Sequence, residues 1–243
     1  MRSPTKNLDY DYVIIGSGFG GSVSALRLSE KGYKVLVVEK GKWFKNSEDF
    51  PKSNWNLRKW LWMPGIRFFG IMKITILRHI SIISGTGVGG GSLVYANTLP
   101  RPSRAFYESG SWAGLLDWEE ELDEHYSEAL RMLGATKNPK LFDADKALKD
   151  LAFEIGKEGD FSHSNVAVYF GEAGKTSADP YFNGEGPTRT GCIHCGGCMT
   201  GCRYNAKNTL DKNYLYFAQR LGTDIFAENE VIGVKPINLE DGG

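Results

Sequence analysis

The sequence predicts an α/β protein whose first part is built on a parallel β-sheet. Two apolar runs, Asp11–Ile15 and Tyr33–Glu39, have the length and composition of buried strands. Between them lie a glycine-rich turn and the segment Ser22–Lys31, whose apolar positions fall on one face of a helix. Strand, turn, helix and strand within about 30 residues form a βαβ unit, in which the two strands run parallel.

The composition excludes several classes of function. The 243 residues carry 29 Lys and Arg against 29 Asp and Glu, so the chain lacks the basic field that drives nucleic-acid binding. No window approaches about 18 uninterrupted apolar residues, so we expect no transmembrane segment. Trp60–Ile83 is the most apolar stretch and is interpreted as core strands, with interfacial membrane contact as the alternative. Met1–Lys6 resembles neither a secretory signal nor a twin-arginine leader, so the expected location is cytoplasmic.

Further elements follow along the chain. Acidic residues fill the first turns of the segment beginning at Trp118, which suits the dipole of a helix N-terminus. The stretch Trp55–Gly70 is rich in aromatic residues and gives no clear pattern. We expect two short strands in Ile71–Ser84, helices at Trp118–Leu133, Lys146–Gly156 and Thr209–Leu221, and strands near Val166–Phe170, Asp224–Glu228 and Val231–Ile237.

The first glycine loop has the spacing of a dinucleotide-binding turn. Gly16 permits the tight turn out of the strand, Gly18 lets a pyrophosphate approach the backbone, and Gly21 lets helix and strand pack closely. Glu39 closes the next strand about 20 residues later, where an acid accepts hydrogen bonds from the adenosine ribose. The ligand is NAD or FAD, since both present the same ADP half. The candidate residues are Gly16, Ser17, Gly18, Phe19, Gly20, Gly21, Glu39 and Lys40.

A second glycine loop, Gly85–Asn97, follows an apolar strand. Repeated glycine permits close backbone approach to a flat or charged ligand. Apolar Leu93 and Val94 follow the glycines at once, which indicates a packed loop. Here the sequence resembles the glucose-methanol-choline oxidoreductase family, in its cholesterol-oxidase-like branch. The residues that carry the resemblance are 11–21, 35–41, 85–97, 100–102 and 191–216.

That resemblance implies FAD as the cofactor and hydride transfer from an alcohol carbon to flavin N5. It implies a small hydrophobic alcohol as substrate, sterols included, and an electron-acceptor partner. Tyr95-Ala96-Asn97 departs from the Asn-Gly-Gly that is often found in steroid-oxidising relatives, so the substrate stays open. The cofactor-binding residues that the resemblance adds are Gly87, Gly89, Gly90, Gly91, Ser92, Tyr95 and Asn97, with Val231 at the adenine.

The resemblance also predicts the domain organisation. Residues 9–99 are expected to form the first part of a Rossmann-like FAD-binding domain, 100–205 a substrate-side cap, and 206–243 the second part of that domain. The segment 238–243 is interpreted as a hairpin turn whose second strand is absent. We therefore expect an amino-terminal fragment that cannot turn over substrate, with a split enzyme as the alternative. No histidine matches the late catalytic position of the family, so no catalytic residue is assigned.

All four cysteines lie in one run with the spacing C-x₂-C-x₂-C-x₃-C: Cys192, Cys195, Cys198 and Cys202. Bacterial ferredoxins hold an iron–sulfur cluster with this spacing. The alternatives are reduced thiols packed in a loop, or a zinc site. His194 is interpreted as exposed, with metal ligation as the alternative. A second hypothesis for the whole is an FAD and iron–sulfur electron-transfer or nucleotide-binding subunit without its own substrate chemistry.

Overall fold

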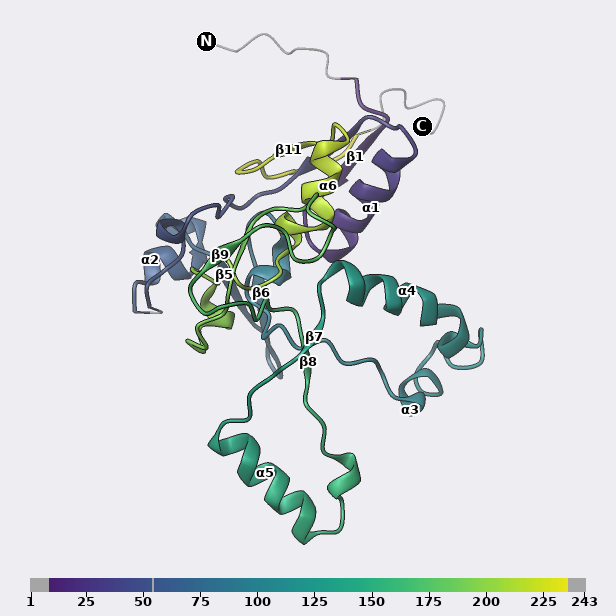
Figure 1. Ribbon diagram of the computed structural model, residues 1–243. Helices are drawn as coiled ribbons and strands as arrows, with labels where there is room; N and C mark the ends of the chain where they lie inside the picture. Colours follow the sequence, from purple (N-terminus) through teal and green to yellow (C-terminus); the bar gives the residue numbers. More distant parts are fainter. Residues whose placement is uncertain (1–8, 54, 236–243) are drawn as a thin grey trace. The chain divides into compact units, whose positions relative to one another are not determined.

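The computed structural model describes residues 9–53 and 55–235 (Figure 1). The chain divides into two compact units. Unit 1 comprises Met1–Tyr95, Met199–Arg203 and Leu210–Gly243, and unit 2 comprises Ala96–Cys198 and Tyr204–Thr209. The assignment of a cofactor role to one part and a substrate role to the other stays a prediction.

A three-stranded parallel sheet organises unit 1. Its strands are β1 (Tyr12–Ile15), β2 (Val35–Val38) and β11 (Asp224–Phe226), with β2 in the middle. Ile15 pairs with Val38, and Val38 pairs with Phe226, so the carboxyl ends of the three strands lie at one edge. The predicted βαβ unit and the strand expected near Asp224–Glu228 are confirmed.

The strand expected at Val231–Ile237 is wrong for its described residues, 231–235, which have no regular structure. The chain leaves the sheet at Glu228, whose backbone is left-handed with φ of 60°. The N–H groups of Glu228 and Asn229 then donate to the carbonyls of Gly41 and Glu39. These bonds take the place of a continued strand ladder. The predicted hairpin turn, 238–243, lies outside the described residues.

Two helices of unit 1 pack side by side, α1 (Phe19–Glu30) and α6 (Tyr214–Arg220), and α1 also packs on β1 and β2 (Figure 1). Both bury small and aliphatic side chains, among them Ala25 and Leu215 at 0% exposure. The helix expected from Thr209 begins at Tyr214 instead. The Asn213 side chain accepts a hydrogen bond from the Tyr214 N–H at 2.7 Å and so caps the helix. Leu210–Lys212 forms a separate 3₁₀ turn, η6.

The predicted strand pair in Ile71–Ser84 is an antiparallel hairpin of β5 (Met72–Ile76) and β6 (Ser81–Gly85). Only its base belongs to the core, where Ile71 packs with Phe44 and Leu93. Its outer end is exposed, with Ile76 at 78%, so the interpretation as core strands is wrong there. The remaining elements of unit 1 are η1 (Ser47–Asp49), α2 (Leu57–Trp60), β3 (Trp62–Met63), η2 (Pro64–Ile66), β4 (Phe68–Phe69) and η3 (Gly90–Leu93).

Unit 2 combines helices with short antiparallel strand pairs. The predicted helices at 118–133 and 146–156 are confirmed as α4 (Trp118–Met132) and α5 (Asp143–Glu154). The strand expected at Val166–Phe170 is only Asn165–Val166, β8. The other elements are α3 (Arg104–Tyr107), β7 (Thr136–Lys137), η4 (Glu158–Asp160), β9 (Thr176–Ser177) and β10 (Arg189–Thr190), while η5 (Cys198–Thr200) crosses the unit boundary. None of the helices in the described ranges has the length and apolar character needed to cross a membrane.

Candidate nucleotide-binding site

Three loops of unit 1 meet at the carboxyl edge of the parallel sheet. Backbone hydrogen bonds join them: the Gly16 N–H donates to Val38 O at 2.8 Å, and the Glu39 N–H donates to Phe226 O at 2.9 Å. In open α/β sheets, ligands bind outside the carboxyl ends of the strands. The edge formed after β1, β2 and β11 is therefore the candidate site of unit 1.

The first glycine loop has the backbone conformation and close packing predicted for a dinucleotide-binding turn. Gly16 is left-handed, with φ of 93°. A Cβ on Gly21 would lie 2.0 Å from Gly16 O, so only glycine lets α1 pack this closely on the loop. A Cβ on Gly18 or Gly20 would meet no atom within 4 Å. Space therefore remains over the N-terminus of α1, where unpaired N–H groups and the helix dipole favour an anion.

Glu39 joins the loops that follow β1 and β2. Glu39 is a buried residue, 5% exposed. One oxygen accepts from Ser17 N at 3.1 Å and from Ser17 Oγ at 2.8 Å, and the other accepts from Gly41 N at 2.9 Å. A carboxylate has about four acceptor positions, so about one is left for a ligand hydroxyl. The sequence did not reveal this joining role, and the predicted contact with ribose stays a prediction. Lys40 follows, half-buried.

The second glycine loop packs against the first through its backbone. A Cβ on Gly90 would lie 2.7 Å from the Cα of Gly18, and a Cβ on Gly41 would lie 2.3 Å from the N of Gly87. These glycines are thus required by contacts within the protein, whether or not a ligand is bound. Gly89 is left-handed with φ of 102°, while the Cβ of an alanine at Gly91 would only reach ordinary contact, 3.8 Å, with Phe19.

Two fully buried serines fix this junction. Ser17 Oγ accepts a hydrogen bond from the Gly89 N–H at 3.0 Å. Ser92 Oγ donates to Gly89 O at 2.7 Å and accepts from the Leu210 N–H at 3.1 Å. Both serines were predicted to be cofactor-binding residues. The structure gives them contacts inside the protein and no exposed surface.

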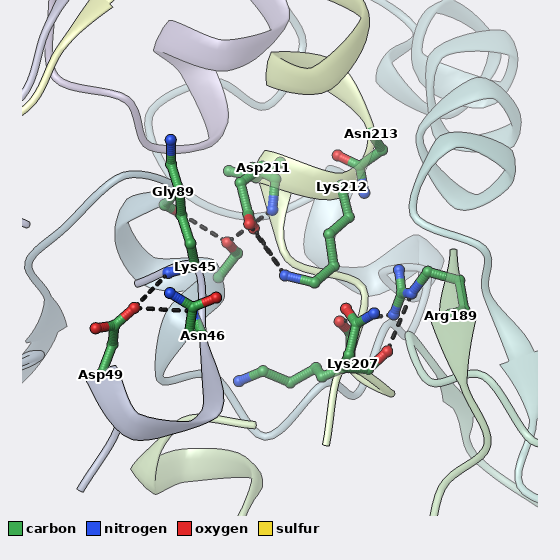
Figure 2. Close-up of polar contacts among 12 residues, drawn as sticks. Lys45, Asn46, Asp49, Gly89, Arg189, Lys207, Asp211, Lys212 and Asn213 are labelled. Carbon is green, nitrogen blue, oxygen red and sulfur yellow. Dashed lines mark hydrogen bonds and ion pairs between the residues drawn. The ribbon is translucent and has the colours of Figure 1, made fainter. Parts of the chain in front are cut away.

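A half-buried ion pair follows Leu210 directly. Lys212 Nζ lies 3.0 Å from Asp211 Oδ2, and the two side chains are 17% and 10% exposed (Figure 2). Asn213, next in the chain, is 1% exposed. None of these residues was predicted from the sequence to belong to the site. The signal that points to them is the polar run Asp211-Lys212-Asn213 directly before an amphipathic helix.

The remaining predicted residues lie as follows. The rings of Phe19 and Tyr95 meet edge to face at 5.9 Å between centroids, both in unit 1. Val231 is half-buried beyond the end of β11. Asn97 belongs to unit 2, where it is left-handed and its carbonyl accepts from Ala167 N at 2.8 Å. The structure therefore does not place Asn97 among the unit 1 residues of the site.

The cysteines are not gathered into a metal centre. No disulfide joins them. Cys202 belongs to unit 1, whereas Cys192, Cys195 and Cys198 belong to unit 2. Across the described ranges, no three side chains of His, Cys, Asp or Glu lie together in a way that could hold a metal ion. The iron–sulfur and zinc interpretations therefore gain no support from the geometry.

His194 is half-buried, so its interpretation as exposed is wrong. Its ring stacks on Phe170 at 5.6 Å and meets Phe142 edge to face at 5.9 Å. Burial, followed by the nearby charge of Lys140, lowers the pKa of His194 below 6.5. The packing between two aromatic rings explains its position without a metal.

Known proteins resemble both the sequence and the fold. Residues 14–43 match the family described as NAD(P)-binding Rossmann-like domain. A cholesterol oxidase of Acinetobacter baumannii is 54% identical over 237 residues, covering 96% of this chain and 42% of that protein. This chain is a relative of the bacterial cholesterol oxidases. A cholesterol oxidase of Mycobacterium tuberculosis H37Rv is 51% identical over 93% of this chain and 40% of that protein.

The resemblance predicted from the glycine loops is thus confirmed, and so is the α/β, Rossmann-like fold class. The chain spans about two fifths of the length of these relatives. Among solved structures, pyridoxine 4-oxidase from Mesorbium loti matches 90% of this chain and 42% of that chain with a TM-score of 0.50. At 15% sequence identity, that likeness concerns the fold alone.

Proposed function

We propose that this chain supplies the FAD-binding part of an oxidoreductase that oxidises the CH–OH group of a sterol or another hydrophobic alcohol. The observation that carries the proposal is the 54% identity to a cholesterol oxidase over 96% of the chain. The activity and substrate belong to proteins more than twice as long, so they are inferred for any polypeptide that contains this sequence.

The geometry of unit 1 fits a dinucleotide. The open space over Gly18 and Gly20 admits a pyrophosphate at the N-terminus of α1, and Glu39 has about one acceptor position left for a ribose hydroxyl. The second loop favours FAD over NAD because it carries the more specific part of the resemblance to the glucose-methanol-choline oxidoreductases, which implies FAD. Its Gly89–Gly91 segment would lie along the cofactor on the side away from the adenine.

Each part of the chain then has a separate task. FAD, when bound, accepts the hydride that leaves the alcohol carbon. Gly18 and Gly20 keep the N-terminus of α1 accessible, and the contacts of Ser17 and Ser92 hold the two loops in fixed positions. We assign no proton-transferring residue within the described ranges. No histidine in those ranges makes a contact at the candidate edge of unit 1 that would support this role.

Cofactor identity is tested by reconstitution. The protein is incubated with FAD or NAD, desalted, and assayed for retained cofactor by absorbance. We expect stoichiometric FAD and no NAD. Gly18→Val should abolish retention, because the new side chain enters the open space, where its Cβ would meet no protein atom within 4 Å. Gly65→Val is the matched control, since that position also has no neighbour within 4 Å but lies in η2. Retention of NAD alone, or undiminished FAD binding by Gly18→Val, would contradict the proposal.

Substrate class is tested on the FAD-loaded, full-length protein that contains this sequence. Anaerobic mixing with cholesterol and with a long-chain primary alcohol should reduce the flavin, seen as loss of its absorbance. Reduction by cholesterol supports a sterol substrate. Reduction by the primary alcohol alone would overturn the sterol as substrate and leave another hydrophobic alcohol. Reduction by neither would favour an electron-transfer subunit. Admitting oxygen then shows whether oxygen itself or a separate carrier reoxidises the flavin.

A further inference from the structure

The ion pair of Asp211 and Lys212 is the most buried pair of opposite charges among the described ion pairs. The ammonium reaches both carboxylate oxygens, at 3.0 and 3.3 Å. Neither side chain was predicted from the sequence to have a functional role. The desolvation free energy of two buried charges exceeds their electrostatic attraction unless the geometry is favourable. Such a pair is therefore weak evidence for a stabilising role.

The pair is fixed to the second glycine loop. The N–H of Leu210 donates to Ser92 Oγ at 3.1 Å, which anchors η6 to the loop. A Cβ on Gly89 would lie 3.9 Å from Asp211 N, so the pair begins directly beside Gly89. Figure 2 shows the Lys212 side chain extending back toward Asp211 and Gly89 rather than away from them.

Gly89 also connects the pair to the first loop. Its N–H donates to Ser17 Oγ, and the next residue, Gly90, packs on the Cα of Gly18. The backbone at Leu210 and Asp211 is therefore held on the loop that contacts the turn at the N-terminus of α1, and the Asp211 carboxylate holds the Lys212 ammonium. A pyrophosphate bound there carries two negative charges, whereas the helix dipole supplies only about half a positive charge. A lysine is a suitable point charge for a phosphate.

Resting on the proposed function, we propose that Lys212 is a cofactor-binding residue whose ammonium pairs with the pyrophosphate of FAD. In the cofactor-free protein, Asp211 binds the ammonium and competes with the phosphate for it. The oxidised isoalloxazine ring is uncharged, so the pyrophosphate is the part of FAD that this cation would recognise. The two residues then have opposite effects on cofactor affinity.

The test measures affinity of the cofactor-free protein for FAD, ADP and riboflavin by calorimetry. Lys212→Met should weaken FAD and ADP by roughly tenfold or more, the scale of one charged hydrogen bond, and leave riboflavin unchanged. Lys212→Arg should restore most of the affinity. Asp211→Asn should tighten FAD and ADP binding, because the ammonium loses its competitor. Lys34→Met, at an exposed lysine of unit 1 beside the start of β2, is the matched control.

A purely structural pair predicts a different pattern. Lys212→Met and Asp211→Asn would then weaken all three ligands in parallel with a lower melting temperature, and this result would overturn the proposal. Equal FAD affinity in wild type and Lys212→Met would also overturn it, while leaving the proposed function intact. A wild-type protein that binds neither FAD nor ADP would instead refute the proposed function. Raising the salt concentration should lower the ADP affinity of wild type more than that of Lys212→Met.

Discussion

Ser17→Ala tests whether one hydroxyl joins the two glycine loops. In the wild-type protein, Ser17 Oγ donates to the Glu39 carboxylate at 2.8 Å and accepts from the Gly89 N–H at 3.0 Å. The substitution removes both bonds from a fully buried position. The Ser17 backbone N–H still donates to Glu39, so the carboxylate keeps two of its three donors.

The expected cost follows from these contacts. A hydrogen bond to a charged group contributes about 1.5–3 kcal/mol, and a buried N–H left without an acceptor costs about 1–3 kcal/mol. Because the two effects share one site and the loop can relax, we expect a loss of about 3 kcal/mol in the free energy of unfolding. For a chain of this size, that corresponds to a fall in melting temperature of roughly 6–12 °C.

Urea unfolding followed by tryptophan fluorescence measures this loss, with thermal unfolding as the second readout. The control is Ser24→Ala, an exposed position in α1, where the change should stay within about 0.5 kcal/mol. A loss below about 1 kcal/mol for Ser17→Ala would refute the reasoning. It would mean that Gly89 and Glu39 do not depend on this hydroxyl for their positions.

Three further predictions concern stability, titration and metal content. Gly21→Ala should lower the free energy of unfolding in urea by roughly 1–3 kcal/mol or more, because its Cβ would lie 2.0 Å from Gly16 O. Gly20→Ala, whose Cβ would have no neighbour within 4 Å, should raise the free energy of unfolding by about 0.5–1 kcal/mol. Similar effects of the two substitutions would contradict the packing argument. Burial raises the pKa of Tyr181 above 10.0, so its contribution to stability is complete below pH 10.0 and is lost as the pH rises through the raised pKa. Tyr181→Phe should therefore show a smaller alkaline loss of unfolding free energy, and an unchanged pH profile would count against it. Iron and acid-labile sulfide assayed after anaerobic purification test the cysteine run: stoichiometric amounts of both would support the iron–sulfur interpretation, and four titratable thiols with neither would contradict it.

The sequence predicted those parts of the fold that depend on neighbouring residues. The β1–α1–β2 unit follows from two apolar runs, a helical period and the turn at Gly16, all within a short stretch of chain. The start of α6 was placed too early because the sequence does not show which polar residue caps the helix. Asn213 does so, and Thr209, 3% exposed, lies before η6.

Contacts between distant segments were not predictable in the same way. The glycines of the second loop were assigned to a ligand, yet a Cβ on Gly90 would lie 2.7 Å from Gly18 Cα, and a Cβ on Gly87 would lie 2.8 Å from Lys42 O. Only the fold shows that a second loop occupies this space. The same holds for Glu39, whose position after β2 was visible in the sequence while its three protein donors were not.

The junction at Gly89 has a consequence for how the chain acquires its structure. The bond from Gly89 to Ser17 spans 72 residues, and the bond from Leu210 to Ser92 spans 118. Closing such long loops lowers the chain entropy before the stabilising contacts form. Elements that depend on these long-range contacts therefore form late in folding. We expect the cofactor edge to be absent from any early intermediate that contains only the βαβ unit. A ligand that binds only the completed edge then shifts the equilibrium toward the folded chain, by an amount set by the ratio of its concentration to its dissociation constant.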